Sequence, residues 1–152
     1  MASEVEAAVL TLLRATRDPN LDRDDLLEQT PKRVARAWGE WFSGYEEDPA
    51  QILAKSFEDV SSYDGIIVLR DIPFFSHCEH HLAQIEGRAT VAYLPGGESR
   101  RAVGLSKLAR LVFCFSRRLQ IQERMTGQIA QAVMDHLKAE GCGVVVKAIH
   151  GC

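Results

Sequence analysis

Apolar and polar residues follow two different spacings along this chain, and the spacing changes near residue 65. Before that point the apolar residues recur every three or four positions, which is typical of helices. Ser3 and Glu6 form a Ser-x-x-Glu capping box, so the first helix is expected to start at Ser3. A turn at residues 18–20 should end it, and its apolar stripe consists of Val5, Val9, Leu12 and Leu13.

A second helix start is indicated by Thr30 followed by Pro31, a capping residue before a proline at the first helical position. Residues 26–27 before it are expected to form a short helical turn or loop. The helix should continue to Gly44. A third, short helix is predicted after Asp48 and should end near Phe57.

Beyond residue 65 the pattern indicates strands. Residues 66–72 are a run rich in β-branched residues, a strand that Pro73 should end. In residues 88–94 the side chains alternate between two faces, with Ala89, Val91 and Tyr93 on one of them. A third strand is expected at residues 144–149. The first two strands are joined by a loop and should be antiparallel, which favours an α+β fold with a three-stranded sheet.

Two further helices lie between the second and third strands. One opens at residues 104–107, with Ser106 as its capping residue, and the other starts at Gln122. The second has an apolar stripe that indicates core packing: Met125, Ile129, Val133 and Leu137. His136 is expected at the surface of this helix. Residues 141–143 should form the turn before the last strand.

Composition narrows the class of protein. The chain has 152 residues, 46% of them hydrophobic and 26% charged, which fits one globular domain. A net charge of −3 gives no general attraction to nucleic acid or to an anionic membrane. The N-terminus has no basic region of a signal peptide, and no apolar run is long enough to span a bilayer. We therefore expect a cytoplasmic protein.

The four cysteines are expected to be thiols or metal ligands, since disulfides are rare in the cytosol. Cys114 lies in an apolar run and should be a small core residue. Cys142, between two glycines, is interpreted as a turn thiol. Cys78 and Cys152 stand next to histidines and have a different interpretation.

Cys78 and His81 have a Cys-x-x-His spacing, which lets one tight turn direct a sulfur and a ring nitrogen to the same point. His150 and Cys152 form a second such pair at the end of the last strand. Cys78, His81 and Cys152 are therefore predicted to bind one Zn²⁺. Three protein ligands plus water would make a catalytic site, with His80 and His150 available for proton transfer. A fourth protein ligand would make a structural site.

Basic residues could hold an anion near the helix that starts at residue 104. Lys107 and Arg110 lie near its N-terminus, where unpaired backbone N–H groups and a positive partial charge favour phosphate. Many helices begin this way, so the signal is weak by itself. Arg33 and Arg36 share a face of the second helix, and a solvated basic face is the simpler interpretation of that pair.

Four motifs together resemble the GTP cyclohydrolase I family. They are residues 78–81 (Cys-Glu-His-His), 104–107 (Gly-Leu-Ser-Lys) with Arg110, 120–124 (Gln-x-Gln-Glu-Arg) and His150-x-Cys152. The likeness runs from Thr30 to the last residue. It implies a zinc enzyme that converts GTP and water to 7,8-dihydroneopterin triphosphate and formate, the first step of tetrahydrofolate and pterin biosynthesis.

The resemblance also implies roles for single residues. His150 would protonate N7 of the purine, and His80 would serve as acid and base on the ribose side. Glu123 would accept hydrogen bonds from guanine N1 and N2, with an amide contact from Gln122. The remaining substrate-binding residues by this likeness are Ser106, Lys107, Arg110, Arg36 and Glu79. The family more often has lysine at position 36, and arginine keeps the charge there.

The family fold implied is the tunnelling fold, an antiparallel sheet with two antiparallel helices on one face, preceded here by N-terminal helices. We expect a helical region at residues 1–62 and a catalytic domain at residues 63–152. Family members form rings that stack into a decamer, with pockets between subunits. The family continues beyond the position of Cys152 with a further strand, so we expect this sequence to be part of a longer chain.

Two alternatives to an active enzyme are open at this point. One is a homologue that binds GTP or zinc without turnover. The other is an interaction module with structural zinc, in which His80 or His150 supplies a fourth ligand. Glu123, Lys107 and Arg110 at family spacing argue against the second alternative.

Overall fold

The computed structural model describes residues 2–16, 24–57, 65–96 and 101–152, and its chain divides into two compact units, Met1–Phe42 and Ser43–Cys152. The first unit consists of α1 (Ala2–Ala15) and α2 (Asp24–Trp41), which contact each other. The predicted start of the first helix is thus confirmed within one residue. The turn predicted at residues 18–20 and the domain boundary predicted between residues 62 and 63 lie outside the described residues.

The predicted start of the second helix at Thr30 is wrong. α2 begins at Asp24, and Pro31 lies inside it, so residues 26–27 are helical. A proline inside a helix costs one backbone hydrogen bond. Packing overrides that cost here, because α2 contacts α1 and Pro31 is itself buried. α2 ends at Trp41, before the predicted Gly44.

The second unit begins with a 3₁₀ turn, η1 (Ser43–Glu46), and α3 (Pro49–Ala54). Asp48 caps α3, since its carboxylate accepts a hydrogen bond of 2.9 Å from the Ala50 N–H. The predicted helix after Asp48 is confirmed but ends three residues earlier. Its end is followed by β1 (Ser56–Phe57), which pairs with β4 (Ala102–Val103).

A four-stranded sheet forms the other layer of this unit, in the order β5-β2-β3-β6. Its strands are β2 (Ile67–Cys78), β3 (Gln84–Leu94), β5 (Leu119–Gln120) and β6 (Gly141–His150). β2, β3 and β6 pair antiparallel, as predicted for the first two, but β5 runs parallel to β2. The expected purely antiparallel, three-stranded sheet is therefore corrected to a mixed sheet of four strands. β5 has two residues, too few for a period-2 pattern.

Pro73 does not end its strand, contrary to the prediction. β2 continues five residues beyond it, and Pro73 pairs in register with Arg88 of β3. β5 pairs with β2 at His77 and Cys78, so β2 has a described neighbour on one side alone at Pro73. A proline without an N–H is tolerated at such an edge position. The extension makes Cys78 the last residue of a strand.

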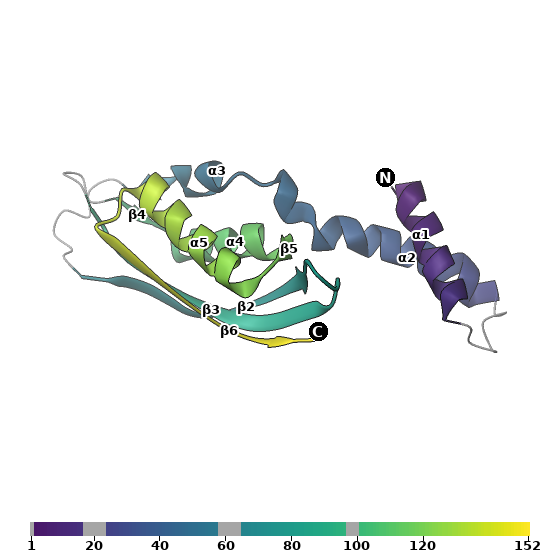
Figure 1. Ribbon diagram of the computed structural model, residues 1–152. Coiled ribbons are helices and arrows are strands. Elements are labelled where there is room, and N and C mark those ends of the chain that lie inside the picture. Colours follow the sequence, from purple (N-terminus) through teal and green to yellow (C-terminus); the bar gives the residue numbers. More distant parts are fainter. Residues whose placement is uncertain (1, 17–23, 58–64, 97–100) are drawn as a thin grey trace. The chain divides into compact units, whose positions relative to one another are not determined.

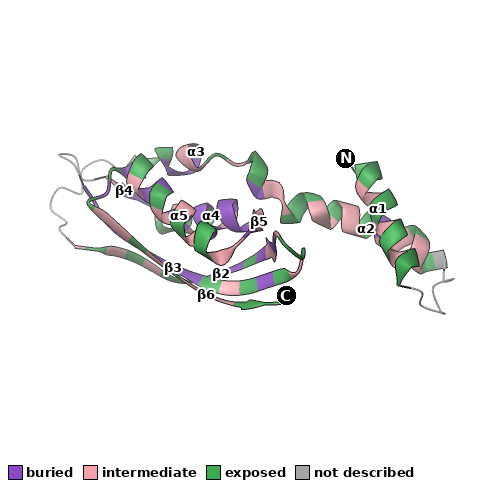
Figure 2. Cartoon of the chain, viewed as in Figure 1, coloured by how far each residue is buried: buried purple, intermediate pink, exposed green. Residues whose placement is uncertain are grey.

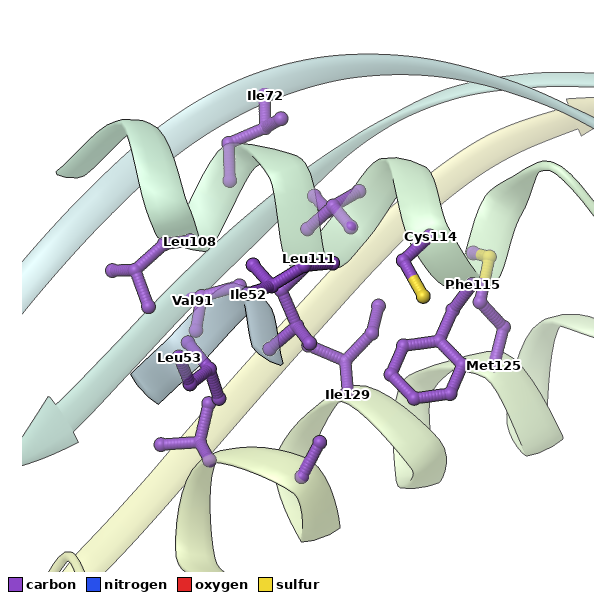
Figure 3. Close-up of a cluster of buried hydrophobic side chains, with 14 of the residues drawn as sticks. Ile52, Leu53, Ile72, Val91, Leu108, Leu111, Cys114, Phe115, Met125 and Ile129 are labelled. Carbon is purple, nitrogen blue, oxygen red and sulfur yellow. The ribbon is translucent and has the colours of Figure 1, made fainter. Parts of the chain in front are cut away.

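The helices α4 (Leu105–Ser116) and α5 (Gln122–Leu137) cover one face of the sheet (Figure 1). The buried residues of the unit gather between these two layers (Figure 2). Figure 3 shows side chains from α3, α4, α5 and the sheet meeting there. The predicted stripe of α5 is confirmed, because its four residues are at most 1% exposed. The face of β3 that carries Ala89, Val91 and Tyr93 is buried as well.

Several smaller predictions can be compared with the structure. Cys114 is fully buried and His136 is exposed, as expected. Cys142 is a strand residue of β6, so its interpretation as a turn thiol is wrong. The N-cap of α4 is Gly104 and not Ser106, which is an exposed residue of the first turn. None of the described helices combines the length and the hydropathy that crossing a membrane requires.

Candidate metal centre and its surroundings

A tight turn after β2 brings Cys78 and His81 together. The Cys78 N–H donates to the carbonyl of Ala83 at 2.8 Å, and its own carbonyl accepts from the Leu82 N–H at 2.8 Å. Leu82 has a φ of 57°, in the left-handed region that a reversal this tight requires. The Cys78 Sγ and His81 Nδ1 consequently lie 3.7 Å apart.

Cys152 reaches the same point from β6, the edge strand that follows β3 in the sheet. β6 pairs with β3 as far as His150, opposite Ile85, and the Gly151 N–H donates to the Gln84 carbonyl at 2.8 Å. One ligand atom each of Cys78, His81 and Cys152 then lie within 4.8 Å of one another. The structure thus brings together the two motifs that are more than 65 residues apart in the sequence.

The pKa values of the two sulfurs of this cluster are shifted in opposite directions. A hydrogen bond from His81 is the main cause that lowers the pKa of Cys78 from 9.0 to about 6. The hydrogen bond with Cys78 raises the pKa of Cys152. Cys78 is 4% exposed, whereas His81 and Cys152 are exposed. Two thiols and one imidazole, with one thiolate stable near neutral pH, are a donor set that suits Zn²⁺.

Of the two histidines predicted to transfer protons, His80 contacts this cluster and His150 lies two residues before Cys152. His80 places its Nδ1 4.0 Å from the Cys78 Sγ and its Nε2 3.5 Å from a Glu79 oxygen. His150 places its Nε2 2.9 Å from the Gln122 Oε1. Each ring therefore has a neighbour that can fix its orientation.

The first turn of α5 supplies three consecutive polar residues to this region. Gln122 contacts His150, and Arg124 forms an ion pair and hydrogen bond with Glu79 in the turn after β2. Glu123 between them is exposed. The helix N-terminus also carries a positive partial charge. Sequence reasoning missed Arg124 as a site residue, because its partner Glu79 is 45 positions away and nothing local indicates the pair.

The basic residues predicted to bind phosphate lie elsewhere in the chain. Ser106, Lys107 and Arg110 belong to the first turns of α4. The last turn of α4 is the one near Cys78, because the Gln120 side chain donates to the Phe115 carbonyl and Gln120 pairs with Cys78. A helix of 12 residues is about 18 Å long. The N-terminal residues of α4 are therefore separated from the metal cluster of the same chain by about that length.

Lys107 and Arg110 line a hollow of about 310 Å³ together with acidic residues of η1 and its vicinity, Glu46, Glu47 and Asp48. Arg36 belongs to the other compact unit and is exposed. Within the second unit, the predicted substrate residues thus fall into two groups: Gln122, Glu123 and Glu79 lie with the metal cluster, and Ser106, Lys107 and Arg110 lie in the first turns of α4.

Known proteins match almost the whole chain. A family model described as GTP cyclohydrolase I matches residues 5–152. The proteins named GTP cyclohydrolase 1 of Brucella abortus and Brucella melitensis are each 54% identical over 151 residues, which is 99% of this chain and 68% of the relative. The protein of the same name from Brucella suis is 54% identical over 150 residues. The chain thus spans about two thirds of the length of these relatives.

Proposed function

Because the chain belongs to the GTP cyclohydrolase I family, we propose that it converts GTP and water to 7,8-dihydroneopterin triphosphate and formate. The observation that carries this proposal is the cluster of Cys78, His81 and Cys152, with His80 in contact with it and His150 two residues before Cys152. The product would enter tetrahydrofolate and pterin synthesis, and the protein would act in the cytoplasm.

Cys78, His81 and Cys152 would hold a Zn²⁺ ion, which supplies a water of lowered pKa at neutral pH when it is bound. The donor set supports this choice, since thiolates and imidazole are the usual ligands of zinc. With three protein ligands the ion would stay accessible to water, as catalytic zinc ions are. The reaction consumes two waters as C8 is released as formate, and it returns one when the six-membered ring closes.

Two imidazoles would carry the protons of the reaction. His150 would donate a proton to N7 of the purine, which makes C8 a better electrophile. His80 would exchange protons with the ribose as it rearranges. Histidine suits both steps, because its ordinary pKa of about 6.5 makes both protonation states accessible near neutral pH.

Guanine would be recognised at the first turn of α5. The exposed Glu123 carboxylate can accept two parallel N–H bonds from N1 and N2 of guanine, donors that adenine lacks on that edge. Gln122 would add an amide contact, and Glu79 would lie at the border of the site. These three residues lie in or next to the elements that carry the metal cluster, which supports the assignment.

The triphosphate would be held by Ser106, Lys107 and Arg110, with Arg36 as a further cation. Since Ser106 and Lys107 are about one helix length away from the metal cluster of the same chain, they would serve the site of a second copy, and Arg110 on the same helix would act with them. A homo-oligomer with pockets between subunits, a decamer as in the family, satisfies this requirement. A monomer with a self-contained site does not.

The experiment is to incubate the zinc-loaded protein with GTP and to follow the dihydropterin by absorbance, or by fluorescence after oxidation. Product that disappears with a chelator and returns with zinc supports the proposal. A Cys142→Ala variant is the matched control, since this cysteine lies in β6 but outside the cluster. Tight GTP binding without product would indicate a homologue that binds but does not turn over. Zinc without GTP affinity would indicate a structural site.

A further inference from the structure

Gln122 has both ends of its amide engaged. The side-chain Nε2 donates to the backbone carbonyl of Val146 in β6 at 3.2 Å. A carbonyl oxygen can only accept, so this contact decides which end of the amide is the nitrogen. The Oε1 end therefore faces the His150 Nε2, at 2.9 Å.

The orientation of the amide determines where His150 carries its proton. The Gln122 Oε1 is an acceptor alone, so a hydrogen bond at 2.9 Å requires a proton on the His150 Nε2. Neutral His150 then has its lone pair on Nδ1. The charged ring has protons on both nitrogens, so the bond to Gln122 is compatible with both protonation states.

The backbone on both sides of this contact is fixed. Gln122 is the first residue of α5, and its carbonyl accepts from the Thr126 hydroxyl at 2.7 Å. His150 is held by pairing with Ile85 and by the bond from the Gly151 N–H to Gln84. Two anchored backbones joined by one amide leave the imidazole little freedom to rotate.

We infer that Gln122 is a positioning residue, whose amide bridges the Val146 carbonyl and His150 and thereby makes Nδ1 the nitrogen of His150 that exchanges protons with the substrate. This inference rests on the proposed function and adds a role for Gln122 besides base binding. The second N–H of the amide is still available for guanine, so the two roles are compatible.

The test uses zinc-loaded protein labelled with ¹⁵N in its histidines, and detects ring N–H protons at fixed pH. His150 should show a protected proton on Nε2, identified by its loss in His150→Ala. The variant Gln122→Met removes the acceptor and should abolish the signal through exchange with water. Gln122→Glu keeps an acceptor and should retain it. Gln131→Met is the matched control, because Gln131 lies on the same helix and bonds Asp135.

Kinetics separate the positioning role from base binding. Gln122→Met should lower kcat by roughly ten- to a hundredfold, since a misoriented acid loses part of the 10²–10⁴-fold that general acid catalysis contributes. Gln122→Glu should recover part of that loss. A proton found on Nδ1 of the wild-type protein, or an equally protected Nε2 proton in Gln122→Met, would overturn the inference. The NMR spectrum can be recorded without turnover. An inactive protein would therefore contradict the proposed function, while the spectrum would still test the positioning role of Gln122.

Discussion

Gly87 of β3 pairs with Ala148 near the end of β6 that leads to His150 and Cys152. A Cβ added there would lie 2.5 Å from the Lys147 carbonyl oxygen, 2.8 Å from the Ala148 Cβ and 2.8 Å from the Phe74 Cζ. Two of these three neighbours belong to β6, which delivers His150 and Cys152. We therefore expect Gly87→Ala to push the end of β6 away from β3.

The magnitude follows from the kind of contact. Inserting a methyl group into a filled space costs about 1–3 kcal/mol, and here two of the contacts are with a neighbouring strand that cannot rotate away. With a urea dependence of about 2 kcal/mol per molar, the unfolding midpoint should fall by roughly 0.5–1.5 M. If β6 moves to relieve part of this strain, Cys152 moves with it and zinc should bind more weakly. The zinc affinity should fall tenfold for each ~1.4 kcal/mol.

The assay compares Gly87→Ala with Gly143→Ala at one protein concentration. Gly143 lies in the same sheet, on β6, and nothing lies within 4 Å of the added Cβ. This control should be as stable as the wild type or slightly more stable, because alanine loses less backbone entropy than glycine on folding. Urea unfolding would be measured on the metal-free proteins and zinc affinity by competition with a chelator. If Gly87→Ala matched Gly143→Ala in both its urea midpoint and its zinc affinity, the described packing of β6 on β3 would be refuted.

Three further predictions concern the site and the core. In metal-free protein, the thiolate absorbance of Cys78 should appear as pH rises through about 6, because the hydrogen bond from His81 stabilises the anion. The variant Cys78→Ser should lack this step. A first thiolate step near pH 9 in the wild-type protein would contradict the prediction. Glu123→Ala should abolish GTP binding measured by calorimetry while zinc content stays unchanged, and retained affinity would show that the guanine assignment is wrong. Ile129→Ala should lower the free energy of unfolding by about 2–5 kcal/mol in chemical denaturation, because this side chain is fully buried, whereas a loss below 1 kcal/mol would contradict the described core.

The elements with long, regular patterns could be predicted from the sequence. α5 has four apolar residues at helical spacing, and β3 has a clean alternation, so burial of one face followed from periodicity alone. The interpretation of Thr30 and Pro31 as a helix start failed because a local signal was overruled by packing against α1. The prediction that Pro73 ends its strand failed for a related reason. A proline is tolerated within β2 because that position has a described, paired neighbour on one side alone, and no local pattern reveals this.

In the candidate site, too, some features were predictable from the local sequence and others were not. The spacing of Cys78, His81 and Cys152 was sufficient to predict one cluster, because each pair stands at the end of a strand-like run. The ion pair of Arg124 with Glu79 and the amide bridge from Gln122 to His150 were not predictable. Both depend on the packing of the first turn of α5 beside the ends of β2 and β6, which is a property of the assembled fold.

We propose that this chain releases C8 of GTP as formate at the site formed by Cys78, His81 and Cys152. The most direct measurement uses GTP labelled with ¹³C at C8 and follows the label by carbon NMR in the presence of zinc-loaded protein. We expect labelled formate in equal amount to the dihydropterin, and none with a Cys78→Ser variant. Label that stays in the nucleotide, or formate released equally by Cys78→Ser, would contradict it.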